Sequence, residues 1–205
     1  MLPAIAVRDA RPEDAGVLVA LWQEMYSGTG HSRFLAAPSA AGARVAIERL
    51  AAEPSARLVV GELNGEVSAL AYLRRTPLSP LHDEDTVMVE YLHVSSDARR
   101  HGLGKALIAE AAAWADEKDS QHVAAMATAN EREANRFLAR LGLSQFAVIR
   151  LASTHTVRRR LAAEQTPNVL GVLATRRTTL ARRAALMRGA RRPFTVPAAP
   201  ESAGK

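Results

Sequence analysis

Residues 87–108 hold the most informative part of the sequence: Val87-Met88-Val89-Glu90-Tyr91-Leu92-His93-Val94, then Ser95-Ser96-Asp97-Ala98, then Arg99-Arg100-His101-Gly102-Leu103-Gly104-Lys105-Ala106-Leu107-Ile108. The first part alternates apolar residues and is rich in β-branched types, which predicts a strand. The last part begins a long alanine-rich segment with apolar residues at helical spacing, which predicts a helix. A turn with two glycines and three cationic side chains lies between them.

A strand, a glycine turn and a helix start form a suitable geometry for holding phosphate. The first backbone amides of a helix lack intrahelical acceptors, and the helix dipole adds a partial positive charge there. Gly102 and Gly104 let the backbone approach a ligand without a Cβ clash. Arg99, Arg100 and Lys105 supply full charges. The turn is therefore predicted to bind an anionic phosphate group.

The segments on either side predict an alternation of strands and helices. Asn64-Gly65 is a strong hairpin signal, and Asn130 with Glu133 has the spacing of a helix capping box. The predicted strands are residues 4–8, 56–63, 66–73, 87–94, 121–128 and 146–151; the predicted helices begin near Pro12, span 43–52, follow Gly102 and follow Asn130. This order predicts a mixed α/β layer architecture.

The pattern Arg-x-x-Gly-x-Gly at residues 99–104 follows the end of a predicted strand by five residues. It resembles the acetyl-coenzyme A pyrophosphate loop of the GNAT superfamily of N-acetyltransferases, and the resemblance extends over roughly residues 5–152. It implies the acyl-CoA N-acyltransferase fold, a mixed central sheet flanked by helices, in a domain of residues 1–152. It also implies an acetyl-coenzyme A-dependent N-acetyltransferase that acts on a primary amine of an unidentified acceptor.

The resemblance implies positions for the cofactor. It places Leu92, His93 and Val94 beside the pantetheine arm, as an added strand would lie. Asn130 matches a position that often contacts the cofactor, although a helix cap without a ligand explains it equally well. No metal site is expected. The residues implied at the pyrophosphate are Arg99, Arg100, His101, Gly102, Leu103, Gly104 and Lys105.

Acetyl transfer needs a base for the amine proton and donors for the developing oxyanion. Glu90 lies where many family members carry a carboxylate and is the first candidate base. His93 is the alternative, because its unperturbed pKa of about 6.5 lies near working pH. Many members have a tyrosine directly after the aromatic residue of the Asn-x-x-x-Ala-x-x-Phe helix, which protonates the leaving thiolate; this chain has Leu138 there. Either Tyr91, Tyr26 or a water is the acid, or no acid is used, or the chain binds coenzyme A without transferring an acetyl group.

The acceptor side is shaped in the family by the stretch between the first two helices, here residues 26–41. Tyr26 and Arg33 are the candidate substrate contacts, with Arg33 suited to an acceptor carboxylate. The acidic run at residues 83–85 would attract a cationic amine. Solvated loop charges are the simpler explanation of Arg33 and of the acidic run.

Composition predicts a cytoplasmic protein. The chain of 205 residues is 48% hydrophobic and contains no cysteine, which allows a real core and excludes disulfides and thiolate metal sites. No apolar run is long enough to predict a membrane span or a signal peptide.

The charge is uneven along the chain. Residues 1–150 contain 16 Lys and Arg against 19 Asp and Glu, a net charge of −3, whereas residues 151–205 contain 11 against 2, a net charge of +9. Residues 153–192 are predicted to form a basic helical extension and residues 193–205 a disordered tail. Packing of this extension on the domain, or in a homodimer, is favoured over nucleic-acid binding through phosphate contacts.

Overall fold

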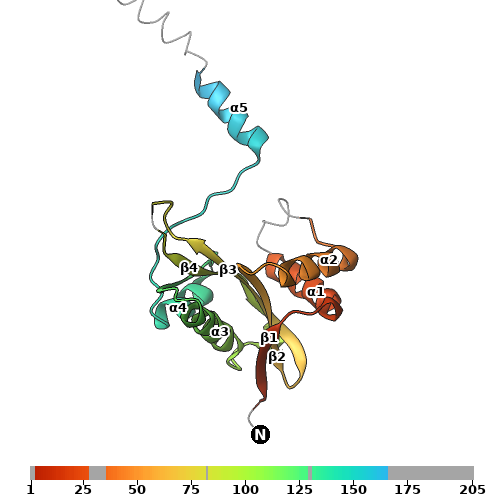
Figure 1. Ribbon diagram of the computed structural model, residues 1–205. Coiled ribbons are helices and arrows are strands. Elements are labelled where there is room, and N and C mark those ends of the chain that lie inside the picture. The colour runs from red at the N-terminus through yellow and green to blue at the C-terminus, as the bar shows by residue number, and fades with distance from the viewer. Residues whose placement is uncertain (1–2, 28–35, 82, 129–130, 166–205) are drawn as a thin grey trace, which may run out of the picture. The chain divides into compact units, whose positions relative to one another are not determined.

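The computed structural model describes residues 3–27, 36–81, 83–128 and 131–165. The chain divides into two units, residues 1–149 and 150–205. Within the described residues, the first unit contains a five-stranded sheet of order β1-β2-β3-β4-β5 (Figure 1). The strands β1 to β4 pair antiparallel, and β4 pairs parallel with β5. The strands are β1 (Ile5–Asp9), β2 (Ala56–Leu63), β3 (Glu66–Pro77), β4 (Asp85–Val94) and β5 (His122–Ala125).

Helices cover both faces of the sheet. A 3-10 turn, Pro12–Asp14, leads into α1 (Ala15–Tyr26), which lies with α2 (Ala40–Ala51) on one face. A second 3-10 turn, Ser96–Ala98, precedes α3 (Leu103–Glu117), which lies with α4 (Arg132–Arg140) on the other face (Figure 1). This arrangement confirms the predicted mixed α/β layers.

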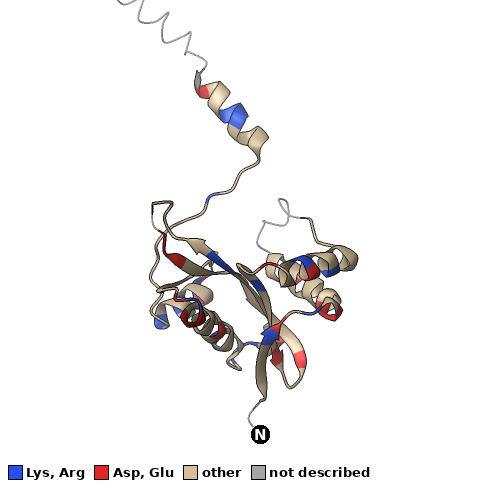
Figure 2. Ribbon diagram, viewed as in Figure 1, with Lys and Arg blue, Asp and Glu red and all other residues tan. Residues whose placement is uncertain are grey.

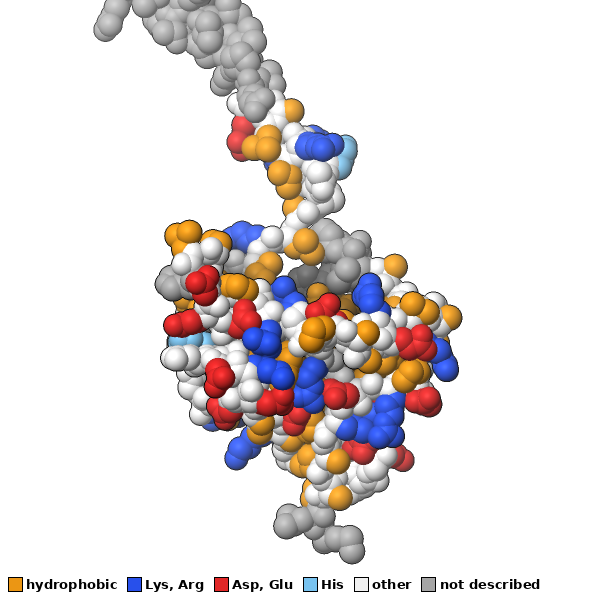
Figure 3. Space-filling model, viewed as in Figure 1, with side chains coloured by type: hydrophobic (Ala, Val, Ile, Leu, Met, Phe, Trp, Pro, Cys, Tyr) orange, Lys and Arg blue, Asp and Glu red, His pale blue; other side chains and the backbone are white. Residues whose placement is uncertain are grey.

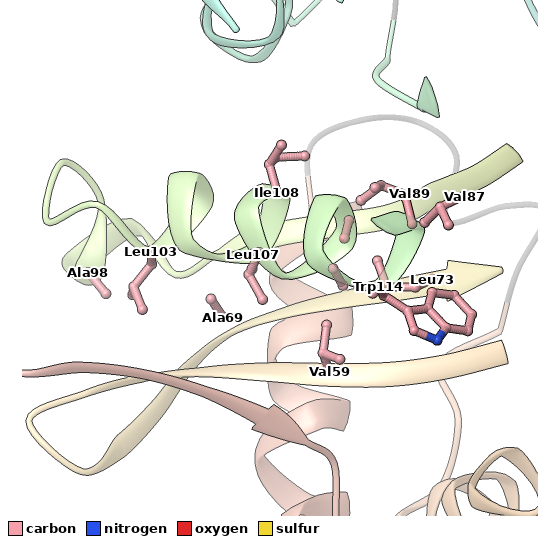
Figure 4. Close-up of a cluster of buried hydrophobic side chains, with 13 residues drawn as sticks. Val59, Ala69, Leu73, Val87, Val89, Ala98, Leu103, Leu107, Ile108 and Trp114 are labelled. Atoms are coloured by element: carbon pink, nitrogen blue, oxygen red, sulfur yellow. The ribbon is translucent and has the colours of Figure 1, made fainter. Parts of the chain in front are cut away.

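The larger core cluster lies between α3 and the sheet. Leu103 and Leu107 of α3 are fully buried against Val59 of β2 and Leu73 of β3 (Figure 4). Burying a side chain of this size contributes about 1.5–3 kcal/mol. The core therefore fixes α3, and with it the glycine turn, against the strands.

The hairpin predicted at Asn64-Gly65 is confirmed. Both residues have positive φ, 53° and 87°, as a type I′ turn requires. The turn joins β2 to β3, and the Asn64 side chain also accepts a hydrogen bond from the Ala4 amide at 3.0 Å. The same asparagine thus connects the hairpin to the start of β1.

Two predicted elements differ in the structure. Residues 146–151 form no strand, and Phe146 is 81% exposed. A strand needs a neighbour that completes its hydrogen bonds, and these residues pair with no strand of the described chain. The strand expected at 121–128 is shorter in the structure, where β5 runs from His122 to Ala125. Helix α4 begins at Arg132 with Glu131 as its N-cap, and the expected cap, Asn130, lies outside the described residues.

The described part of the second unit contains α5 (Thr154–Gln165). Three consecutive arginines, residues 158–160, and one acid, Glu164, lie on α5 (Figure 2). The rest of the predicted basic extension and the predicted tail lie outside the described residues. Among the described residues, no helix is both long and apolar enough to cross a membrane.

Candidate active site

Strands β4 and β5 are paired over only part of their length. The parallel pairing runs from Thr86 to Val89 of β4, and the last link is a hydrogen bond from the Met126 amide to the Val89 carbonyl at 2.9 Å. Beyond Val89, β4 continues to Val94 alongside β3, while β5 has ended. In the described chain, no strand pairs with the β5 side of residues 90–94. A row of backbone donors and acceptors is available there for a ligand.

A β-bulge interrupts β4 beside this edge. Tyr91 and Leu92 of β4 lie opposite the single residue Ala71 of β3. Tyr91 has a φ of 52°, in the left-handed region that bulky side chains rarely adopt. The extra residue changes which side chains face each side of the sheet.

The bulge places Glu90 and His93 on the same face. Glu90 is paired with Tyr72, and His93 with Leu70, and these two β3 residues share a face because they are two positions apart. Leu70 belongs to the core cluster under α1 and α2. In a regular strand, Glu90 and His93 would face opposite sides because they are three positions apart. Both candidate bases therefore lie on the α1 side of the sheet.

Glu90 is held by an arginine of the neighbouring strand. The Arg74 Nη2 atom donates to Glu90 Oε1 at 2.8 Å, and this hydrogen bond is the main cause of the raised pKa of Arg74. The Glu90 side chain is 13% exposed. The ion pair orients the carboxylate and leaves part of it accessible to water.

His93 is buried beside Glu24 of α1. Its Nε2 atom lies 3.6 Å from Glu24 Oε2 and, among the described residues, has no hydrogen-bond partner. Burial lowers the pKa of His93, and the nearby Glu24 charge opposes that shift. Glu24 Oε1 accepts a hydrogen bond from the Ser96 amide at 2.8 Å, which lowers the pKa of Glu24. The glutamate therefore ties α1 to the turn that follows β4, a role that the sequence did not indicate.

Three aromatic rings gather on the same side of the sheet. The Trp22 ring centroid lies 5.0 Å from that of Tyr26 and 5.0 Å from that of Tyr91, with tilted planes. Burial raises the pKa of Tyr26. The sequence had indicated Tyr26 as a substrate contact, but not its association with Trp22. We refer to Trp22, Tyr26 and Tyr91 as the aromatic triad.

The glycine turn ends at a helix start with unpaired amides. Gly102 has a φ of 98° and forms the N-cap of α3 without a side-chain cap. The first helical hydrogen bond runs from the Ala106 amide to the Gly102 carbonyl at 3.0 Å, so the amides of residues 103–105 have no intrahelical acceptor. Arg100, His101 and Lys105 are exposed around these amides. The geometry is that of an anion site.

The family model of the acetyltransferase (GNAT) family matches residues 18–143. The chain belongs to this family. The general activity of this family is acyl transfer. No curated protein sequence matches the chain significantly.

Solved structures share the GNAT fold. Glucosamine-6-phosphate N-acetyltransferase from Arabidopsis thaliana is 13% identical, with a TM-score of 0.61 over 74% of this chain and 99% of that chain. An aminoglycoside N-acetyltransferase in complex with CoA is 13% identical, with a TM-score of 0.59 over 74% of this chain and 95% of that chain. A transcriptional regulator from Bacillus halodurans C-125 is 18% identical, with a TM-score of 0.63 over 73% of this chain and 100% of that chain. At these identities the likeness shows the fold.

The two glycines of the GNAT loop have different roles in the structure. Gly102 is required by its positive φ. A Cβ on Gly104 would lie 3.4 Å from the Phe137 ring of α4 and 3.9 Å from Val94 of β4. These are ordinary van der Waals distances, so the packing of α4 leaves room for a Cβ at Gly104. Arg99 closes the strand end, because its Nε donates to the Val94 carbonyl at 3.3 Å.

Leu138 stands where many GNAT members have a tyrosine. It is half-buried and packs against the core under α3. Its side chain is a hydrocarbon and has no proton to donate. The preceding loop is held instead by Asn135, whose Nδ2 donates to the carbonyls of Thr128 and Glu131 at 2.9 and 2.7 Å. Among the described residues, the tyrosine hydroxyls beside this part of β4 are those of Tyr26 and Tyr91 in the aromatic triad and that of Tyr72, which is paired with Glu90.

The remaining predicted site residues include two that the structure does not describe. Arg33 and Asn130 lie outside the described residues. Within the acidic run 83–85, Asp85 is paired with Arg75 at 2.9 Å. On the face of the first unit seen in Figure 3, acidic and basic side chains are interspersed. In the described part of the chain, no group of three or more His, Asp or Glu residues could hold a metal ion.

Proposed function

We propose that the chain transfers the acetyl group of acetyl-coenzyme A to a primary amine. One observation carries this proposal: the unpaired edge of β4, residues 90–94, leads within a few residues to the unpaired amides at the start of α3. A pantetheine arm with its amides complements a strand edge, and a pyrophosphate complements a helix N-terminus. The solved aminoglycoside N-acetyltransferase complex with CoA, which has the same fold, is consistent with this choice of cofactor.

The proposed cofactor contacts follow the two halves of that surface. The backbone of Leu92, His93 and Val94 pairs with the pantetheine arm, and the amides of Leu103, Gly104 and Lys105 bind the pyrophosphate. Arg100, His101 and Lys105 contribute charge, while Arg99 and Gly102 shape the turn. Asn130 stays a predicted contact.

In the proposed reaction, the amine nitrogen attacks the thioester carbonyl carbon. The carbon–nitrogen bond forms, the carbon–sulfur bond breaks, the amine loses a proton and the thiolate gains one. Glu90 is the proposed base, acting through a water, because its partly exposed carboxylate can be reached from solvent. The Arg74 ion pair uses Oε1, so Oε2 is the oxygen proposed to accept the proton. His93 is the alternative base.

We consider His93 less suited than Glu90 to act as the base. Its Nε2 atom is shielded from solvent and faces Glu24, so an acceptor amine does not reach it directly. We assign His93 to positioning, since its burial between β4 and α1 fixes the strand that carries Glu90. Glu90→Gln is therefore expected to lower kcat by about 100-fold with little change in acetyl-coenzyme A affinity. Full activity of Glu90→Gln, with loss of activity in His93→Gln, would transfer the role to His93.

Leu138 favours a second candidate function, coenzyme A binding without acetyl transfer. Thiol release measured with acetyl-coenzyme A and a panel of primary amines separates the two. Binding of acetyl-coenzyme A in calorimetry with amine-dependent thiol release supports the transferase. Binding with no thiol release from any amine supports the second candidate.

The two ends of α3 provide a matched test of the cofactor site. Lys105 lies at the helix start, whereas Lys118 caps its other end and pairs with Glu117 at 2.6 Å. Lys105→Ala is expected to weaken acetyl-coenzyme A binding by about tenfold, the value of one charge-assisted hydrogen bond. Lys118→Ala removes the same charge and should leave the affinity unchanged. Equal effects of the two variants would exclude the helix start as the pyrophosphate site.

A further inference from the structure

Among the described residues, the face of the sheet toward α3 is filled beside Glu90. On the α3 face, Leu92 and Val94 pack against the buried cluster that holds Leu103 and Leu107. On the opposite face lie Glu90 and the aromatic triad, with Tyr91 39% exposed. The described residues therefore leave the α1 side, which carries the aromatic triad, as the side from which an amine can reach Glu90.

The aromatic triad is a concentration of rings in a chain that has few. Aromatic residues make up 4% of the sequence, and the triad contains three of its five Trp and Tyr residues. The rings are mutually tilted, 51° between Trp22 and Tyr26 and 41° between Trp22 and Tyr91. Such a surface offers ring faces and edges to a further ring at favourable geometry.

Tyr91 holds its ring at a conformational cost. A left-handed conformation costs a residue with a side chain about 1–2 kcal/mol. Full burial of the ring does not repay this cost, because Tyr91 remains partly exposed. Strained residues with exposed side chains are concentrated at ligand sites. The strain arises at the bulge, and it supports a ligand contact at the Tyr91 ring.

One oxygen of each carboxylate beside the triad already has a hydrogen-bond partner. Glu90 is paired with Arg74, and Glu24 binds the Ser96 amide and faces His93. An acceptor with several ammonium groups needs carboxylates that are free to pair with it. The surface suits an acceptor whose remaining body is apolar and flat.

We infer that the acceptor is an aryl-alkyl primary amine, whose ring packs on the aromatic triad and whose amine reaches Glu90. This inference rests on the proposed acetyl transfer. It makes the triad a specificity-determining surface: the ring selects the acceptor, and a short alkyl chain joins the ring to the amine.

The test compares 2-phenylethylamine with n-butylamine as acceptors. The ratio of their kcat/KM values is expected to favour the aromatic amine. Trp22→Leu keeps an apolar side chain but removes the ring, and should reduce this ratio by about three- to tenfold, the usual value of one aromatic pair. Trp22→Phe should restore most of the ratio. Phe146→Leu removes an exposed ring from the segment after α4 and should leave both amines unaffected.

The outcomes of this test distinguish failure of the inferred acceptor class from failure of the proposed acetyl transfer. Equal kcat/KM values for the two amines, or a ratio unchanged in Trp22→Leu with native thermal stability, overturn the inference while leaving the transferase intact. If no amine is acetylated, the proposed function fails. Calorimetric titration of the acetyl-coenzyme A-saturated protein with 2-phenylethylamine then decides the inference, since binding that weakens in Trp22→Leu supports it and absence of binding overturns it.

Discussion

Gly61 of β2 couples the sheet to the start of α3, and its replacement by alanine tests this coupling. A Cβ there would lie 3.1 Å from Leu103 Cδ2 and 3.2 Å from Ala69 Cβ. The position of the Ala69 Cβ atom is set by the backbone of β3. The Leu103 side chain, in the first residue of α3, must therefore move by a few tenths of an ångström. Overpacking of this kind costs about 1–3 kcal/mol. Alanine loses less conformational entropy on folding than glycine does, which offsets about 0.5–1 kcal/mol of that cost. The expected loss of unfolding free energy is about 1–2 kcal/mol.

Gly16 of α1 provides the matched control, because a Cβ there meets nothing within 4 Å. Gly16→Ala should stabilise the protein by up to about 1 kcal/mol. The two variants differ by about 1–3 kcal/mol. Since 1 kcal/mol shifts Tm by about 2–4 °C in a protein of this size, they should melt about 2–12 °C apart. Circular dichroism melting measures the difference, and calorimetry should show weaker acetyl-coenzyme A binding only in Gly61→Ala. Equal melting temperatures would refute the tight packing of Gly61 on Leu103.

Three further outcomes follow from buried groups. Arg8→Met should destabilise the protein by about 2 kcal/mol in urea unfolding, because it leaves Asp14 buried without its charged partner. The Arg8 hydrogen bond is the main cause of the lowered pKa of Asp14. An unchanged free energy of unfolding would contradict this prediction. Burial lowers the pKa of His93 below its ordinary 6.5, so the unfolded chain binds more protons and stability should fall as pH drops through about 6.5, a slope that His93→Gln should remove between pH 7.5 and 5.5. Leu107→Ala, at a fully buried position, should cost about 3–5 kcal/mol, whereas Leu81→Ala, at a position 90% exposed, should cost almost nothing.

Local signals in the sequence were sufficient for most of the fold. The Asn64-Gly65 turn and the glycine turn before α3 depend on backbone conformations that few residues adopt, and those residues are visible in the sequence. The strand expected at 146–151 failed for the opposite reason. Its residue types and their apolar pattern are typical of a strand. A strand also needs the edge of a neighbouring strand to pair with, and a local sequence pattern does not show whether such an edge is present.

The candidate site was predictable only in part. The sequence indicated Glu90, His93 and the turn from residue 99 to 105, because these follow a recognisable spacing. It did not indicate that Glu90 and His93 share a face, since that depends on the bulge opposite Ala71. It also missed Arg74 and Glu24, whose roles arise from pairing across strands and from helix packing at long sequence separation.

Tyr91 can be regarded as an insertion into an otherwise regular strand. If it is left out of the count, an unbroken antiparallel ladder results in which Glu90, Leu92 and His93 lie opposite Tyr72, Ala71 and Leu70. Every other side chain of β4 keeps its face, because the insertion adds one residue to a side that already carries Glu90. The fold therefore does not require Tyr91. We expect a variant that lacks Tyr91 to keep the core and to lose the ring surface beside Glu90.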